Sequence, residues 1–201
     1  WEILMTRTLP LILMLLSSPL IACSSSGDEA AVRDLFKRFQ DGLKNGDGDA
    51  LWGVTDDATK KYFNEFASSI RATCGLVRGS YPADDRVTTL NAIGCNLEAS
   101  AREGRSLFAY MLDPRKLGLP ENHDSTVIAK ALIDGDTATV VTRSDEVVLF
   151  TRNSDGTWGT RMFLSAFKDL PAVMTLRDNI RIAQENCRLL GVDVEAALEK
   201  K

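Results

Sequence analysis

Five residues carry the most distinctive chemistry in this chain, namely Cys23, Cys74, Cys95, Cys187 and His123. A thiol can be alkylated, oxidised to a disulfide or used as a nucleophile. One histidine cannot supply a metal site built of several imidazoles, and any Cys–His catalytic pair would have to use His123. This histidine lies in a polar loop after a proline, which favours a surface position. The sequence therefore names no catalytic residue, no metal ligand and no cofactor, and it favours a protein that is not an enzyme.

Two further features of the sequence could indicate a functional site, but a structural explanation fits each of them better. Residues 45–49 imitate the start of a calcium loop, with oxygen ligands at alternate positions, but Ala50 replaces the expected glycine and Asp56 the expected bidentate glutamate. A turn between two helices explains this segment better. Tyr62 and Tyr110 could donate a proton in an acid–base site, but both lie among apolar residues, and we expect them in the core.

The composition is that of a folded, acidic protein. Of 201 residues, 44% are hydrophobic and 26% are charged, which excludes a disordered chain and favours a single domain. The net charge is −4, without the basic excess that a nucleic-acid-binding protein normally has. We therefore expect no nucleic-acid partner.

The N-terminal segment has the pattern of an export signal. Arg7 precedes an apolar run over residues 9–16, and small residues follow. The run is too short to span a bilayer, which needs about 20 residues. We expect translation to start at Met5, residues 1–4 to be an extension of the gene model, and the signal peptide to end at residue 22.

The end of this signal, Leu20-Ile21-Ala22-Cys23, resembles the lipobox of bacterial lipoproteins. In that family the cysteine thiol is alkylated with diacylglycerol and the preceding peptide is removed. The resemblance implies that Cys23 carries lipid, palmitate for example, and that residues 23–28 form a short tether. It also implies a cell-envelope protein that is anchored to the membrane through Cys23. Ser24 after the cysteine implies the outer membrane, with the protein facing the periplasm.

Three cysteines then remain in an oxidising compartment, so one of three possible pairs can form. Cys74 and Cys95 close the shorter loop, and each lies next to a glycine. Cys187 falls on the apolar stripe of a predicted helix, where it would be buried. The sequence favours a Cys74–Cys95 disulfide and leaves the other pairings open.

The elements that must position these residues follow from the hydrophobic periodicity. Helical spacing dominates both ends of the chain, while residues 126–163 alternate with period two and contain the turn signals Asp134-Gly135-Asp136 and Asp155-Gly156. Asp28 and Thr55 are expected to cap the first two helices. The expected helices cover residues 29–44, 56–75, 84–93, 97–112 and 171–190, and the expected strands cover 126–133, 137–143, 146–152 and 157–163.

Together these elements predict an α+β fold, in which N-terminal helices pack on a four-stranded antiparallel meander and an extra helix lies at the C-terminus. We expect one domain over residues 29–201, with a helical insert at 76–122. The arrangement resembles the nuclear-transport-factor-2-like (SnoaL-like) fold, a cystatin-like roll shaped like a cone. The residues that carry the resemblance are Leu35, Phe36 and Phe39, the turn at 45–47 with Ala50 and Leu51, the hairpin at 132–138 and the return from Phe150 to Trp158.

Enzymes of that family place an Asp or His base, often with a Tyr donor, inside the cone. Because no convergent set of such residues can be recognised here, we expect a non-catalytic, lipid-anchored envelope protein that binds a small molecule or a protein partner. One alternative is an envelope hydrolase or isomerase that uses a carboxylate in the cone. Another is a structural or assembly factor that acts through the C-terminal helix. A cone packed solid with side chains would argue against the enzyme and the small ligand.

Overall fold

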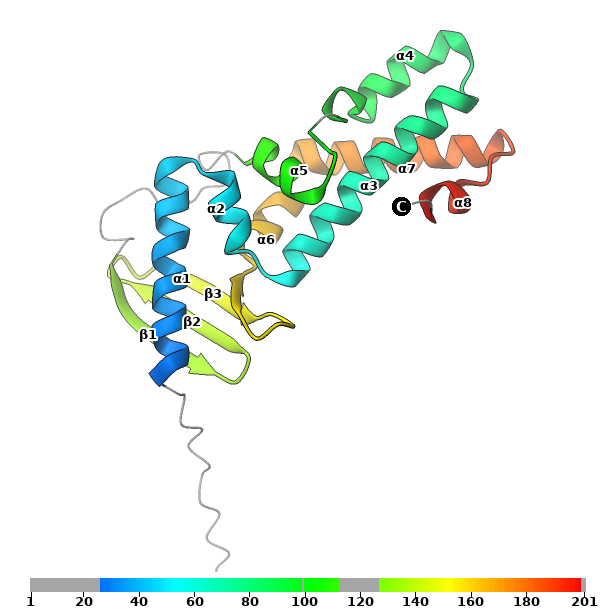
Figure 1. Ribbon diagram of the computed structural model, residues 1–201. Helices are drawn as coiled ribbons and strands as arrows, with labels where there is room; N and C mark the ends of the chain where they lie inside the picture. Colours follow the sequence, from blue (N-terminus) through cyan, green and yellow to red (C-terminus); the bar gives the residue numbers. More distant parts are fainter. Residues whose placement is uncertain (1–25, 99, 113–126, 200–201) are drawn as a thin grey trace, which may run out of the picture.

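The computed structural model describes residues 26–98, 100–112 and 127–199 (Figure 1). A four-stranded antiparallel sheet carries the first helix across one face, and a group of helices extends away from the sheet as an arm. Buried apolar side chains of both parts belong to one continuous core. The predicted α+β class, with helices on an antiparallel sheet and a further helix near the C-terminus, is confirmed. Cys23 and His123 lie outside the described residues.

Two groups of helices can be distinguished. The first helix covers the sheet, and α3, α4, α5, α7 and α8 form what we call the helical arm. The helices are α1 (Ser26–Asn45), α2 (Gly48–Gly53), α3 (Asp57–Ser80), α4 (Ala83–Ala92), the 3-10 helix η1 (Cys95–Leu97), α5 (Gly104–Met111), α6 (Met162–Lys168), α7 (Pro171–Leu189) and α8 (Val194–Glu199).

The sheet is the predicted meander, with its strands paired in chain order. Tight turns are formed where Gly135 and Gly156 adopt positive φ angles of 55° and 83°, a region that side chains disfavour. The strands are β1 (Ile128–Asp134), β2 (Thr137–Thr142), β3 (Val147–Arg152) and β4 (Trp158–Thr160). Alternate residues of β2 and β3 form a buried inner face, namely Ala138, Val140, Thr142, Val148 and Phe150.

The inner face is covered by α1, as predicted. Phe36 and Phe39 of α1 are both buried, and the Phe36 ring meets the Phe150 ring edge-on at 6.5 Å between centroids. Phe39 contacts Phe163 at 5.7 Å. Phe150 and Trp158 of the sheet are also buried. An antiparallel sheet of this size is stable only when one face is covered, and these rings provide the cover.

The last long helix, α7, packs along α3 rather than extending as a free tail. Its buried stripe is Val173, Ile180, Ala183 and Cys187. Polar contacts also hold α7 beside α3. The Gln184 amide donates to the Thr73 hydroxyl at 2.8 Å, and the Tyr81 hydroxyl donates to the Ala183 carbonyl at 3.4 Å. The predicted burial of Cys187 on the apolar stripe of this helix is confirmed.

The two helices for which a capping residue was predicted, α1 and α3, begin differently from the prediction. α1 begins at Ser26, so residues 26–28 of the expected tether are helical and Asp28 lies in the first turn rather than at the cap. An acidic side chain is favoured there by the helix dipole. α3 is capped by Asp56 instead of Thr55, since the Asp56 carboxylate accepts a hydrogen bond from the Thr59 N–H.

The end of α3 and the extent of α5 also differ. α3 continues to Ser80 instead of ending near Gly75, because Leu76 and Val77 are buried while Gly75 lies on the exposed side. Residues 97–112, expected to be helical in patches with an interruption at Gly104, contain the end of η1 and then the short α5, which begins at Gly104.

The fourth strand ends at Thr160, although alternation predicted a strand to residue 163. The Thr160 hydroxyl accepts a hydrogen bond from the Met162 N–H, and the chain turns into α6. Phe163 is then buried from a helix rather than from a strand.

Candidate functional site

A buried carboxylate, Asp56, lies where the sheet meets the helical arm. The linker before α3 runs beside β4, with a parallel bridge between Thr55 and Thr160. The Asp56 N–H donates to the Thr160 carbonyl at 3.0 Å, and the Thr160 N–H donates to the Val54 carbonyl at 2.8 Å. A Cβ atom on Gly159 would come within 2.7 Å of the Asp56 backbone, so glycine permits this close approach.

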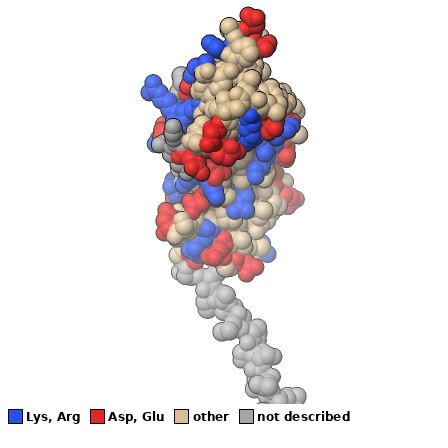
Figure 2. Space-filling model, turned by 90° about the vertical axis from the view of Figure 1, so that its right-hand side faces the viewer, with Lys and Arg blue, Asp and Glu red and all other residues tan. Residues whose placement is uncertain are grey.

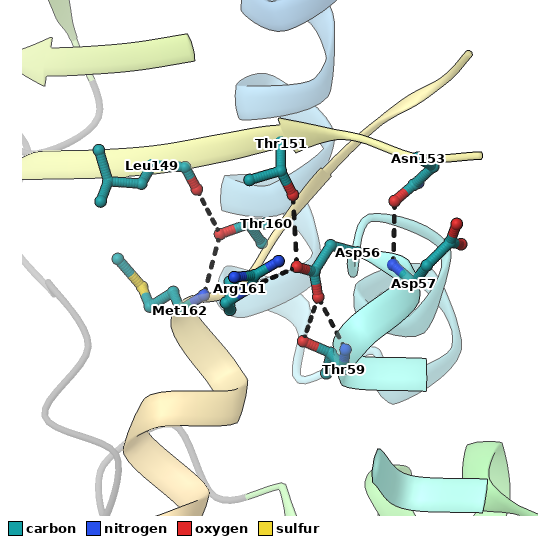
Figure 3. Close-up of polar contacts among 9 residues, drawn as sticks. All are labelled: Asp56, Asp57, Thr59, Leu149, Thr151, Asn153, Thr160, Arg161 and Met162. Atoms are coloured by element: carbon teal, nitrogen blue, oxygen red, sulfur yellow. Dashed lines mark hydrogen bonds and ion pairs between the residues drawn. The ribbon is translucent and has the colours of Figure 1, made fainter. Parts of the chain in front are cut away.

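Four hydrogen bonds occupy the Asp56 carboxylate (Figure 3). Oδ1 accepts from the Thr59 N–H at 2.8 Å and from the Thr59 hydroxyl at 2.6 Å. Oδ2 accepts from the Thr151 hydroxyl at 3.3 Å and pairs with Arg161 Nε at 2.7 Å. A carboxylate has about four acceptor positions, so this set leaves none directed at a substrate. The Asp56 side chain is 2% exposed, whereas that of Arg161 is 54% exposed.

The neighbouring polar residues extend the same junction. Asp57 accepts hydrogen bonds from the N–H and the hydroxyl of Ser154 at 2.8 and 2.7 Å, and these bonds hold the pKa of Asp57 below its usual value. The Asp57 N–H in turn donates to Asn153 Oδ1 at 2.9 Å (Figure 3). These hydrogen bonds, together with the Asp56–Arg161 ion pair, join α3, the β3–β4 hairpin and the start of α6. We therefore assign these polar residues a structural role.

The interior between α3, α5 and α6 is filled by aromatic rings. Phe63 meets Phe108 and Phe167 edge-on at 5.2 and 4.9 Å, and Phe108 meets Phe163 edge-on at 5.2 Å. These four side chains are fully buried. Where α3, α5 and α6 meet, the interior is therefore occupied by side chains.

An open hollow of about 420 Å³ lies instead between α1 and α2, lined by Arg38, Asp41, Gly42, Asn45, Asp47, Ala50, Gly53 and Val54. Asp47 at its rim caps α2, where its carboxylate accepts from the N–H groups of Asp49 and Ala50. The Asp49 side chain pairs with Arg105 at 2.7 Å. The calcium-like segment 45–49 is thus a turn and a helix cap. In the part of the chain that the structure describes, no group of three or more His, Cys, Asp or Glu side chains is arranged to hold a metal ion.

The cysteines predicted to pair do lie together. The Sγ atoms of Cys74 and Cys95 are 1.99 Å apart and their Cα atoms 5.8 Å apart, which is disulfide distance. This pair connects α3 to η1. Cys187 is buried and unpaired, and burial raises the pKa of its thiol.

The two tyrosines have different environments. Tyr62 is half-buried against Phe63 and Phe66, and burial raises its pKa while Arg177 opposes the rise. Tyr110 is 61% exposed, so its predicted core position is wrong. Its side chain points away from the buried pair Leu107 and Phe108, because α5 has a single buried face.

The outer face of the sheet, opposite α1, exposes apolar side chains. Leu132, Val147 and Leu149 are 47%, 55% and 57% exposed. The register places Leu132 and Leu149 on either side of Thr139 in one row across three strands. Exposed apolar groups that cluster in this way mark candidate interaction surfaces. Alternation in β1 and β3 was the sequence signal for this face, but it did not show which alternate set would be exposed.

Charged side chains elsewhere are mixed in sign. Figure 2 shows Lys and Arg interspersed with Asp and Glu over the face that it presents. Several of these charges form ion pairs, such as Arg188 with Glu195 at 2.7 Å and Arg33 with Glu29 at 2.8 Å.

Comparison of the chain with family models, with curated proteins and with solved structures finds no significant match. The lipobox and the cone-fold resemblance therefore stay predictions. Among the helices of the described residues, none is long and apolar enough to cross a membrane.

Proposed function

We propose that this chain is a lipid-anchored envelope protein that binds a protein partner on the outer face of its sheet. The observation that carries the proposal is the exposed apolar row formed by Leu132 and Leu149, with Val147 beside it. The inner face of the same sheet already has its cover in α1. The anchor would be the lipid on Cys23, at the outer membrane and facing the periplasm.

The filled interior favours a protein partner over a small molecule. Small-molecule sites are concave and largely preformed, whereas the rings of Phe36, Phe39 and Phe150 pack between α1 and the inner face of the sheet. A flat apolar sheet face suits the larger contact area of a protein interface.

The catalytic alternative would use a buried carboxylate, and among the residues that the structure describes Asp56 is a buried one. A general base needs an acceptor position within reach of the substrate proton. Asp56 instead directs both oxygens at Thr59, Thr151 and Arg161. The assembly-factor alternative would use the C-terminal helix, but α7 already buries its apolar stripe against the body.

Site-specific photo-crosslinking in cells tests the proposal. A photoreactive residue at position 149 should give one discrete protein adduct, while the same residue at position 189 should not. Leu189 is a matched control, because it is an exposed leucine on α7. Adding Val147→Asp should diminish the adduct at 149, since the charge would interrupt the apolar face. Equal adducts from both positions, or an adduct that Val147→Asp leaves unchanged, would contradict the proposed surface.

A further inference from the structure

The predicted lipid attachment lies very close to the folded body. Only Ser24 and Ser25 separate Cys23 from Ser26, where α1 begins. An extended chain reaches at most about 3.6 Å per residue, so the start of α1 lies within about 11 Å of the Cys23 backbone. A lipid on Cys23 would therefore hold the first turn of α1 at the membrane surface.

The first turn of α1 is fixed to the sheet. Asp28 pairs with Arg152 of β3 at 3.0 Å and accepts a hydrogen bond from the Trp158 indole N–H of β4 at 3.3 Å. The Arg152 guanidinium also lies over the Trp158 ring, 4.4 Å from its centroid, and pairs with Asp136 at 3.2 Å. These contacts tie α1 to both hairpins, so the sheet must follow any orientation that the anchor imposes on the helix.

The two hairpin turns of the sheet carry exposed acidic side chains, one of which, Asp136, pairs with Arg152, and the β3–β4 turn also contacts the start of α3 through Ser154 and Asp57. Asp134 and Asp136 flank the β1–β2 turn and Asp155 lies in the β3–β4 turn, and all three are exposed. Hydrogen bonds from Thr157 hold the pKa of Asp155 below its usual value, so it stays charged at neutral pH. We call the first turn of α1 and these two turns the anchor end.

The helical arm points in the opposite direction. Figure 1 shows the start of α1 at the lower end of the molecule and α4 at the far upper end. The arm is long, since the 24 residues of α3 span about 36 Å at about 1.5 Å per residue.

We propose that the anchor end faces a lipid surface at close range and that the rigid link through Asp28 holds the helical arm away from that surface. This inference rests on the proposed lipid anchor. It adds an orientation, in which the first turn of α1 lies nearest the membrane and the arm tip at α4 lies at the opposite end of the body (Figure 1).

Energy transfer from single labelled sites to headgroup-labelled lipids tests the orientation. The full chain, lipidated in cells, is reconstituted in phosphatidylethanolamine–phosphatidylglycerol vesicles with a dye on Ser154→Cys in the β3–β4 turn or on Val87→Cys on α4. Val87 is 67% exposed. The introduced thiol can be labelled selectively, because Cys74 and Cys95 lie at disulfide distance and Cys187 is buried. The Ser154 variant keeps the backbone hydrogen bond to Asp57.

We expect higher transfer from position 154 than from position 87. A long Gly-Ser insertion between Ser25 and Ser26 keeps the anchor but frees the body, so the ratio of the two efficiencies should fall towards one. Equal transfer from both positions in the uninserted chain, with the protein floating with the vesicles, would overturn the orientation alone. A chain that does not float, and whose Cys23 carries no lipid by mass spectrometry, would overturn the anchor and this inference with it.

Discussion

The sheet with α1 and the outer end of the helical arm are stabilised in different ways. The sheet part buries large rings from two elements, such as Phe36 and Phe150. At the end of the arm, α4 buries none of its residues. Polar contacts hold the two ends of α4. Arg86 donates to the Tyr81 carbonyl just before the helix at 2.7 Å, and Asn179 of α7 donates to the Ala92 carbonyl at its last residue at 2.9 Å. The comparison indicates that fully buried rings dominate in the sheet part, whereas α4 adds only the partly buried Leu90 to the core and depends more on the cysteine pair and a few polar contacts.

The largest effect is expected in the sheet part. Phe39→Ala should lower the free energy of unfolding by about 3–5 kcal/mol, because a fully buried ring is removed without a replacement. Total stabilities are typically about 5–15 kcal/mol, so this change could unfold the chain. Urea denaturation measures it. Met174→Ala, at an exposed position of α7, is the control and should change stability by less than about 0.5 kcal/mol. A similar small loss for Phe39→Ala would refute the primary role of ring burial.

Removing the cysteine pair should act on the arm. The double variant Cys74→Ala/Cys95→Ala opens a loop with a sequence separation of 21 residues and should cost about 3 kcal/mol in the loop-entropy model. Hydrogen exchange should accelerate in α4 before it does in α1. Cys187→Ala is the matched control, because it removes a buried but unpaired thiol and should leave α4 exchange unchanged. Equal acceleration in α1 and α4 would show that the two regions are one cooperative unit.

The smallest effect concerns the junction between the regions and depends on pH. The pKa of Asp57 is lowered in the folded state, chiefly by hydrogen bonds from Ser154. Such a carboxylate stabilises the fold above its unfolded pKa, and the contribution disappears as pH falls through the folded pKa. Asp57→Asn should therefore be less stable than the parent chain at neutral pH, and the difference should shrink below about pH 4. Denaturation series at several pH values measure this difference, and a constant difference down to strong acid would contradict the linkage.

The sequence predicted the sheet better than the arm because the signals for the sheet are local. Two-residue alternation and the turns at Gly135 and Gly156 place the strands without reference to the rest of the chain. The continuation of α3 past Gly75 depends on the burial of Leu76 and Val77, which is a tertiary effect. Glycine is a weak stop signal when the following residues gain a packing partner.

The candidate site was only partly visible in the sequence for the same reason. The spacing of Asp56 and Thr59 fits a helix cap, but two of the groups that occupy the Asp56 carboxylate, on Thr151 and Arg161, are about a hundred positions away. The early end of β4 has a similar origin, since the Thr160 backbone bonds to the Val54–Asp56 linker. By contrast, the pairing of Cys74 with Cys95 followed from their short separation and neighbouring glycines.

The bridge between Thr55 and Thr160 has a consequence for the rate of folding. It joins positions separated by 105 residues (160 − 55), so it cannot form until most of the chain has been made and a long loop has been closed. Contacts of high sequence separation slow folding more than they alter stability. The hairpins and the helix α1 can form from nearby residues. The docking of α3 onto β4 must wait for this closure, and so must the docking of α1 onto the sheet, because Asp28 and Trp158 are 130 positions apart. An exported chain would therefore cross the membrane before its helices dock on the sheet, and the junction at Asp56 would be completed late in folding.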